Sequence, residues 1–236
     1  MIGPAVYGVI AAAKRYGDAF YDNVSLLLHM DGANLGTTFT DNSKTPKAPS
    51  STVGSPYTTT GDYKYPTASF YGDGTSATTG RVLVYASHVD FAFGTGDFTV
   101  EFYFKSYNNS QDQGMFSLND AGANFGISCT SGEIRFRHTS TTILALTGAV
   151  NSAWHHCAFS RVSGVLYGFV DGVLIGSVAN TTNYSQSLFV VGGWSSQAAS
   201  VYGCNGRIDD VRITKGIGRY TATFNALIKP FPNFKW

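Results

Sequence analysis

Glycoside hydrolysis is the first chemistry to consider, because it needs only two carboxyl groups at a fixed separation. The chain contains two glutamates, Glu101 and Glu133, and they lie in different predicted strands. Glu101 is followed by Phe102 and Tyr103, so no second carboxylate lies nearby on its face of the strand. Most aspartates stand beside glycine or asparagine, in contexts typical of turns. We therefore expect no catalytic residues and a protein that is not an enzyme.

Nucleophilic and phosphate-binding sites are not indicated either. The sequence has no Gly-x-Ser-x-Gly elbow and no phosphate-loop signature. His155 and His156 are adjacent in a predicted strand, where neighbouring side chains face opposite sides, so they cannot easily hold one ion together. Cys129, Cys157 and Cys204 are far apart and lack a Cys-x-x-Cys spacing. This pattern predicts buried free thiols instead of a zinc site.

A structural calcium ion is the metal for which the sequence offers candidate ligands, since Ca²⁺ takes oxygens from carboxylates, carbonyls and amides on loops. Asp31, Asp41 and Asn42 flank the first predicted strand, and Asp209 and Asp210 lie in the last. First and last strands are often neighbours in sandwiches, so the five residues could converge. The alternative is that Asp31 and Asp41 form turns and Asp209 caps a bulge. No EF-hand-like spacing decides between the two.

Sugar binding would use exposed aromatic rings beside polar groups. Trp194 follows two glycines and precedes Ser-Ser-Gln, which is typical of a loop tip. Tyr103 is predicted to lie on the outward face of its strand. The candidate carbohydrate-binding residues are Trp194, Tyr103, Tyr184, Asn183 and Tyr202. Aromatic residues of this kind also pack between subunits, so an interface role stays open.

Composition argues against two classes of partner. Of the 236 residues 13% are charged and the net charge is +1. No basic cluster exceeds Lys14-Arg15, so we expect no nucleic-acid binding. No apolar run approaches the ~18–20 residues of a membrane span, so we expect no membrane insertion. The apolar run 6–13 precedes its positive charges, unlike a secretory signal, so we expect synthesis in a cytoplasm without a signal peptide.

Residues 1–22 are predicted to form an N-terminal arm, helical over about Pro4–Tyr16. Proline suits the first turn, and Lys14-Arg15 followed by Gly17 suits the end of a helix. Apolar residues recur at helical spacing. They are Val6, Val9, Ile10 and Ala13. This face must pack either on its own sandwich or on a neighbouring molecule as a docking arm, and the sequence leaves both open.

Everything after the arm is typical of strands joined by turns. Residues 98–105 alternate, with Phe and Val pointing to the core and the polar side chains and Tyr103 pointing away. Asp171-Gly172 predicts a tight hairpin. In the last strand Ile208 and Val211 are out of phase, which predicts a bulge near Asp209-Asp210. Further strands are predicted at 24–29, 133–138, 154–161, 165–170, 173–175, 188–191 and 207–214, with an extended loop or edge at 40–68.

Such a series of short strands with turn signals between them predicts an all-β, two-sheet antiparallel sandwich, not a parallel α/β sheet. We find no helix-length pattern between strands and no internal repeat.

Four segments resemble the laminin-G-like (concanavalin-A-like) jelly-roll domains of bacteriophage structural proteins. They begin NVSLLLHMDG (23–32, with 38–43), DFAFGTGDFTVEF (90–102), WHHCA (154–158, with 169–173) and GRIDDVRITKG (206–216, with 219–224 and 230–232). The resemblance covers about residues 23–232. It implies a jelly-roll domain over 23–236 with a C-terminal tail, 231–236, and in some members calcium or carbohydrate. Two features depart from the family: Tyr103 stands where tryptophan is usual, and 44–68 is longer and richer in Pro and Thr.

Three hypotheses about function follow. The first is a non-enzymatic phage virion structural protein that displays a lectin-like jelly-roll on the particle surface, as a tail fibre, tail tip or capsid decoration. It would dock through its termini to other virion proteins and to further copies of itself as a homo-oligomer. The alternative is a carbohydrate-binding module that recognises host cell-surface glycans. The third is a divergent polysaccharide hydrolase built around Glu101.

Overall fold

The computed structural model describes residues 16–74, 80–107, 112–118, 125–194 and 203–235, and every structural statement below concerns these residues. They form strands and two short 3-10 helices, η1 (Tyr21–Asn23) and η2 (Val89–Phe91). The strands are β1 (Val24–Leu28), β2 (Ser51–Val53), β3 (Thr58–Thr59), β4 (Ser69–Asp73), β5 (Val82–Tyr85), β6 (Phe98–Ser106), β7 (Gln113–Leu118), β8 (Phe125–Thr130), β9 (Glu133–His138), β10 (Thr141–Thr147), β11 (His155–Val162), β12 (Val165–Val170), β13 (Val173–Ala179), β14 (Phe189–Val191) and β15 (Asn205–Lys215).

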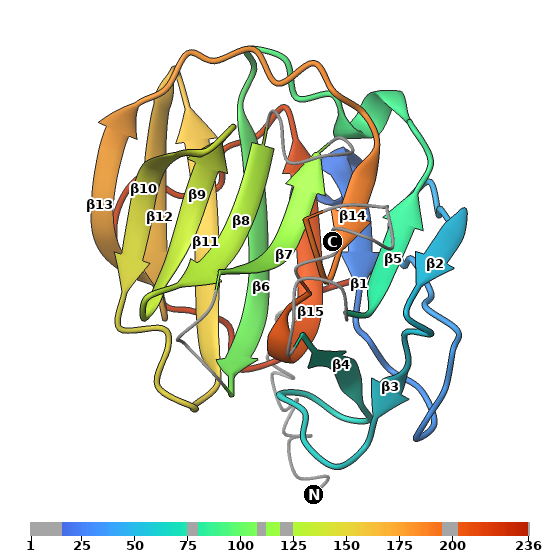
Figure 1. Cartoon of the computed structure of the whole chain (residues 1–236). Coiled ribbons are helices and arrows are strands. Elements are labelled where there is room, and N and C mark those ends of the chain that lie inside the picture. The colour runs from blue at the N-terminus through green and yellow to red at the C-terminus, as the bar shows by residue number, and fades with distance from the viewer. Residues whose placement is uncertain (1–15, 75–79, 108–111, 119–124, 195–202, 236) are drawn as a thin grey trace, which may run out of the picture.

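The strands assemble into two antiparallel sheets packed face to face, as Figure 1 shows. Sheet A has the order β13-β12-β11-β6-β15-β4-β3, and β1 pairs with β15 beside β4. Sheet B has the order β10-β9-β8-β7-β14-β5-β2. The predicted all-β jelly-roll sandwich is confirmed, and so is the pairing of the first strand with the last. No helix of the described residues is long and apolar enough to span a membrane.

The main core fills the space between the sheets. The alternation of β6 places Phe98, Val100 and Phe102 in this core with no exposed surface. Sheet B contributes Phe125 and Phe136, and the Phe98 ring lies 6.1 Å from each of these rings. Packed aromatic rings bury large apolar areas, which is the main favourable term in folding such a sandwich. β6, the strand of sheet A that contributes these residues to the core, is therefore the strand that the sequence pattern identifies most clearly.

The last strand contains the predicted bulge. The register between β15 and β6 shifts between Asp209 and Arg212, and Asp210 has a φ of 46°. The extra residue turns Ile208 and Val211 to the same side, where both are fully buried. The bulge thus lets two apolar residues three positions apart share one face of a strand.

The hairpin between β12 and β13 turns at Asp171-Gly172, as predicted. Both residues have positive φ, 50° and 80°. This combination is typical of the tight turn that matches strand twist, and it favours Asp-Gly. The carbonyl oxygen of Gly172 also accepts a hydrogen bond of 2.9 Å from the amide of Phe224, so the turn holds the C-terminal segment.

The C-terminal segment, residues 216–235, covers the outward face of sheet A. A second apolar cluster forms between the two, in which Tyr103 and Phe231 are each 2% exposed. The Tyr103 hydroxyl donates to the carbonyl oxygen of Leu227 at 2.6 Å. The tail that we expected to dock on neighbouring subunits therefore places Phe231 on its own sandwich, and Phe234 remains 45% exposed.

Other sequence predictions have mixed outcomes. Cys129, Cys157 and Cys204 are buried free thiols, as predicted. The segment 40–68 supplies the short strands β2 and β3, which are the last strands of their sheets. The expected arm helix lies outside the described residues, apart from Tyr16 at its end, and so do Val6, Val9, Ile10 and Ala13.

Two glycines with matching backbone angles provide a test of the contact between the hairpin and the C-terminal segment. Gly132 (φ 81°) and Gly172 (φ 80°) both have left-handed backbones, but a Cβ on Gly132 would meet no atom within 4 Å. A Cβ on Gly172 would lie 2.1 Å from the carbonyl oxygen of Phe224. We expect Gly132→Ala to lower the free energy of unfolding by about 1 kcal/mol, from backbone strain alone, and Gly172→Ala by about 2–4 kcal/mol. Equal losses in urea unfolding would show that the hairpin does not hold the C-terminal segment.

Candidate functional site

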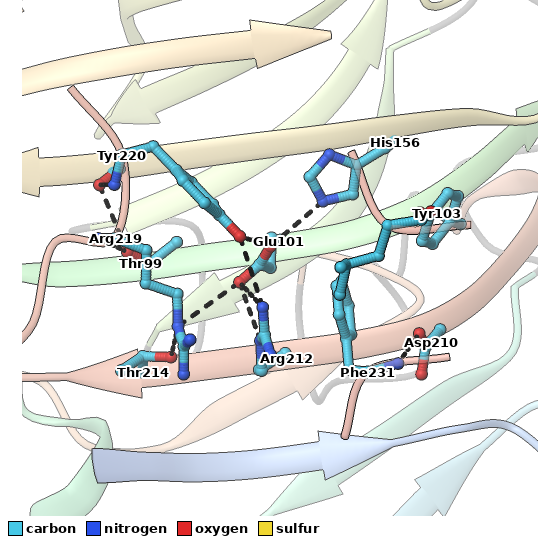
Figure 2. Close-up of polar contacts among 12 residues, drawn as sticks. Thr99, Glu101, Tyr103, His156, Asp210, Arg212, Thr214, Arg219, Tyr220 and Phe231 are labelled. Carbon is cyan, nitrogen blue, oxygen red and sulfur yellow. Dashed lines mark hydrogen bonds and ion pairs between the residues drawn. The ribbon is translucent and has the colours of Figure 1, made fainter. Parts of the chain in front are cut away.

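Glu101, the candidate catalytic carboxylate, lies at the centre of a buried polar cluster on the outward face of sheet A. Its side chain has no exposed surface. Oε1 accepts a hydrogen bond of 2.9 Å from Nε of Arg212 on β15. Oε2 accepts hydrogen bonds from Nε2 of His156 on β11, at 3.2 Å, and from the hydroxyl of Tyr220, at 3.0 Å. Figure 2 shows these groups converging from β6, β11, β15 and the C-terminal segment.

Asp18 extends the cluster to the N-terminal side of the chain. Arg219 donates two hydrogen bonds to its carboxylate, of 2.9 and 2.7 Å. Arg212 donates a third, of 3.0 Å. The cluster therefore pairs two carboxylates with two guanidinium groups, all at most 6% exposed in their side chains. Such an arrangement satisfies the buried charges, as burial requires.

The carboxylates of Glu101 and Asp18 stay ionised around neutral pH. Burial by itself would raise the pKa of Glu101, but the positive charge of Arg212 and the hydrogen bond from His156 outweigh it and lower the pKa to about 2. Burial would also raise the pKa of Asp18, yet Arg219 and Arg212 hold it below its ordinary value. Both oxygens of Glu101 are occupied by protein donors. The geometry therefore suits a structural role, in which the cluster joins segments that are far apart in the sequence. We call the pairing of Glu101 and Asp18 with Arg212 and Arg219 the clamp.

The histidine pair behaves as predicted, because the two side chains face opposite sides of β11. His156 is buried at Glu101, whereas Nδ1 of His155 lies 2.7 Å from a carboxylate oxygen of Asp171. Trp154 at the start of the same segment lies at the edge of the second apolar cluster, and its indole donates to Asp62 at 3.0 Å.

The candidate calcium ligands do not form one site. Asp41 is 4% exposed, and its carboxylate accepts hydrogen bonds from the amides of Leu27, Ser43 and Lys47 and from the Ser43 hydroxyl. The backbone amide of Asn42 donates to the carbonyl oxygen of Leu27 at 2.7 Å. Asp31 accepts the amide of Thr67 at 2.6 Å. These groups organise turns, which is the alternative that the sequence analysis left open.

Asp209 and Asp210 point to different partners at the bulge. Asp209 accepts the amides of Lys64 and Tyr65 on Oδ2, and burial, with the charge of Asp210, raises its pKa to about 8. Asp210 contacts His29 at 2.6 Å and accepts the amide of Phe231. Within the described ranges, no group of three or more His, Cys, Asp or Glu side chains is placed to hold a metal ion.

Two of the five candidate sugar-binding residues are buried, which corrects the prediction for them. Tyr103 faces outward from β6 as expected, but the C-terminal segment covers it. Tyr184 has no exposed surface and packs its ring against Phe98 and Phe125 in the main core. Asn183 is exposed, and Tyr202 lies outside the described residues.

Trp194 is a half-buried candidate aromatic that the structure places on sheet B. Its indole lies on the outward face of sheet B, over two glycines. A Cβ on Gly126 of β8 would lie 1.8 Å from the indole ring, and one on Gly114 of β7 would lie 2.6 Å from it. The Ser117 hydroxyl donates to the Trp194 carbonyl at 2.9 Å. The ring can lie this close to the sheet only because both positions lack a side chain.

Polar side chains surround the indole on the same face. The guanidinium of Arg137 on β9 lies 5.4 Å from the ring centre and pairs with Asp112 at 2.8 Å. Arg135 pairs with Glu133 at 2.9 Å, and Thr130 also contacts Asp112. We call this surface the indole platform; it comprises Trp194, Gly114, Gly126, Ser117, Ser128, Thr130, Arg135, Arg137 and Asp112.

Trp194 was predicted from the sequence, but the rest of the platform was not. The available signal was glycine inside strands, at 114 and 126, because such a glycine often marks a close approach of another group. The arginines gave no signal by themselves, since charged residues alternate with apolar ones on the exposed face of many strands.

Comparison with known families and structures gives a consistent picture of the fold. The family model described as the concanavalin A-like lectin/glucanases superfamily matches residues 84–216. Comparison with curated protein sequences gives no match.

Among solved structures, the binding domain of botulinum neurotoxin serotype D/C superposes with a TM-score of 0.63 at 13% identity, over 83% of this chain and 49% of that one. The binding domain of botulinum neurotoxin DC in complex with rat synaptotagmin II gives 0.60 at 12%, over 83% and 48%. Domain 4 of the arabinanase AbnA from Geobacillus stearothermophilus, in complex with arabinotriose, gives 0.59 at 16%, over 82% and 93%. The chain thus spans about half the length of the matched neurotoxin chains.

The two glutamates of the chain allow a matched test of the clamp. Glu101→Gln removes a buried negative charge that pairs with Arg212. We therefore expect a loss of about 3–5 kcal/mol in the free energy of unfolding. Glu133→Gln removes only an ion pair near the surface and should cost about 0–1 kcal/mol. Urea unfolding at neutral pH measures both, and equal small losses would contradict the clamp.

The same variants predict a difference in acid. Because the folded-state pKa of Glu101 is about 2 and its ordinary value is 4.5, its contribution is fully present above pH 4.5 and is lost as the pH falls toward 2. The stability of the Glu101→Gln variant should therefore fall less over this range than that of the wild type or of Glu133→Gln.

Proposed function

The chain belongs to the concanavalin A-like lectin/glucanases superfamily, and on that premise we propose that it is a non-enzymatic, lectin-like module that binds a glycan on the indole platform. The observation that carries this proposal is the seating of the Trp194 ring on Gly114 and Gly126. A half-buried tryptophan seated on a sheet is suited to stack its remaining exposed surface on the apolar face of a sugar ring.

The polar groups of the platform fit the same ligand. Sugars need hydrogen-bond donors and acceptors around the stacked ring, because each hydroxyl that loses water must find a partner. Arg137 and Asp112 supply donors and acceptors beside the indole, and their side chains are 16% and 40% exposed. Their mutual ion pair holds them in place before the ligand arrives, which lowers the entropy cost of binding.

The structural neighbours support a binding role. One is a domain of an arabinanase in complex with arabinotriose, and others are binding domains of botulinum neurotoxins, one of them in complex with rat synaptotagmin II. These likenesses concern the fold, so the ligand of this chain rests on the platform itself.

The non-enzymatic part of the proposal rests on the two glutamates. Glycoside hydrolysis uses two carboxyl groups that reach one glycosidic bond. Glu101 is fully buried on sheet A, and Glu133 pairs with Arg135 on the outward face of sheet B. They therefore lie on different sheets and do not flank one ligand.

Trp194→Ala should weaken binding to the glycan that the wild type prefers on an array by at least about tenfold, since an aromatic stack contributes about 1–3 kcal/mol in comparable sites. Gly126→Val should do the same by displacing the indole, because its Cβ needs the space of the ring. Tyr63→Ala, which removes a 41% exposed aromatic from elsewhere on the surface, is the matched control. Calorimetry would contradict the proposal if the wild type binds no glycan or if Trp194→Ala binds as tightly.

A second proposal concerns where the module works, namely as a structural component displayed on a phage particle. It is supported by the resemblance of four sequence segments to phage proteins and by exposed apolar residues near the two ends of the described chain, Phe20, Ile228 and Phe234. Exposed apolar groups of this kind suit contacts with neighbouring proteins. Mass-spectrometric copy counting in salt-washed particles tests it: a symmetric copy number is expected, and absence from the particle would contradict it.

A further inference from the structure

Two ion pairs lie on or beside the indole platform, and in each of them the carboxylate is more exposed than the guanidinium group. The Asp112 side chain is 40% exposed, whereas that of its partner Arg137 is 16% exposed. The Glu133 side chain is 30% exposed, and that of its partner Arg135 is 25% exposed. These four charges sum to zero, but a ligand that arrives from solvent meets more of the negative charge than of the positive charge. The difference is largest at Asp112.

Asp112 lies close to the ring on which we propose that a sugar stacks. Its Oδ2 accepts a hydrogen bond of 2.8 Å from Nη1 of Arg137, whose guanidinium lies 5.4 Å from the centre of the indole ring. Its Oδ1 accepts a hydrogen bond from the hydroxyl of Thr130. Because each carboxylate oxygen can accept two hydrogen bonds, the exposed side of Asp112 retains the capacity to accept a sugar hydroxyl.

Arg137 offers little to an acidic sugar, although its guanidinium is the cation nearest to the indole in the described structure. Nη1 binds Asp112, and Nη2 donates to the carbonyl oxygen of Ser140 at 3.1 Å. Nε is buried and has no hydrogen-bond partner among the described residues. A ligand carboxylate could therefore form two parallel bonds to this group only by displacing Asp112, whereas single N–H groups of Nη1 and Nη2 remain for hydroxyls.

The second ion pair lies further along β9, away from the indole. Arg137 is opposite Gly126, on which the indole rests, and Arg135 is opposite Ser128. Two residues of a strand span about 6.6 Å, so Arg135 and Glu133 follow the stacked ring as a separate group of donors and acceptors. A ligand of more than one sugar unit could therefore contact both ion pairs.

The exposed polar side chains on the neighbouring strand β10 carry no charge. Thr142 is opposite Arg137, and Thr147 is opposite Glu133. Both threonines are exposed. Their hydroxyl groups can donate and accept hydrogen bonds with sugar hydroxyls, but they do not compensate a charge on the ligand.

We propose, on the basis of the glycan-binding function proposed above, that the indole platform selects an uncharged oligosaccharide and that Asp112 excludes acidic sugars. A carboxylate on the stacked sugar would approach the exposed charge of Asp112, and like charges brought together in a binding site are costly. A neutral sugar instead donates a hydroxyl to Asp112, which forms a charge-assisted hydrogen bond. A sugar with an ammonium group is attracted to the same carboxylate.

A glycan array with matched charges tests the selection. It would carry oligomers of glucose, galactose and mannose, each also as the corresponding uronate and as the corresponding amino sugar. We expect the best neutral ligand of the full chain to bind at least about tenfold more tightly than its uronate, because only the uronate repels Asp112. Its amino counterpart should bind at least as tightly as the uronate. A uronate that binds as tightly as its neutral counterpart would overturn the proposal.

Asp112→Asn tests whether this residue is the cause. The substitution keeps the shape of the side chain and removes its charge, so the preference for the neutral sugar over its uronate should fall by about fivefold or more. In about 1 M salt the wild-type preference should also fall, because exposed charges are screened beyond about 3 Å. A preference that is unchanged in Asp112→Asn would show that Asp112 does not exclude acidic sugars.

Asp73→Asn is the matched control. Asp73 pairs with Arg81 at 2.8 Å, and its side chain is 35% exposed, but it lies on β4 of sheet A. The control removes the same charge from a similar ion pair on the other sheet, so it should leave the sugar preference unchanged. An equal fall of the preference in both variants would assign the effect to the net charge of the protein and would contradict a role of Asp112.

Trp194→Ala separates the charge class of the ligand from the function itself. If uronates bind best and Trp194→Ala loses that binding, the platform is a glycan site and only the proposed charge class is wrong. If no glycan binds the wild type, or if Trp194→Ala binds as tightly, the glycan-binding function is wrong and the selection by Asp112 fails with it.

Discussion

The structure depends on the buried pairing of Glu101 and Asp18 with Arg212 and Arg219. Two carboxylates taken out of water are costly unless each finds a cation and hydrogen-bond donors, and here each does. The partners come from the start of the chain, the central strand β6, the last strand β15 and the segment after it. One polar cluster therefore holds both ends of the described chain on the same face of sheet A.

This constraint makes the two outer faces of the sandwich different. The outward side chains of β6 on sheet A, Thr99, Glu101 and Tyr103, are at most 2% exposed because the C-terminal segment covers them. On sheet B, glycines at 114 and 126 leave room for the Trp194 ring, and paired charges surround it. The glycan site that we propose lies on sheet B, on the side of the sandwich opposite the face that the C-terminal segment covers.

Local sequence patterns predicted much of the fold. The alternation of 98–105, the Asp171-Gly172 turn and the bulge at Asp209-Asp210 depend on neighbouring residues, and all three are present. The clamp joins residues 111 and 194 positions apart, so no short pattern could indicate it. Tyr103 was predicted to be available for a sugar. Its outward direction was correct, but neighbouring residues could not indicate that the distant C-terminal segment covers it. Trp194 was identified from its glycine-rich context, whereas its platform depends on the register of β7, β8 and β9.

The most direct test of the assignment of the two faces is a map of amide and indole NMR shifts. The full chain would be titrated with the oligosaccharide that it binds best. We expect the largest changes on the Trp194 indole and on the amides of Gly114, Gly126 and Arg137. The amides of Thr99, Glu101 and Tyr103 should stay unchanged. If the largest changes fall instead on the outward face of sheet A or in the C-terminal segment, the assignment of the two faces is wrong.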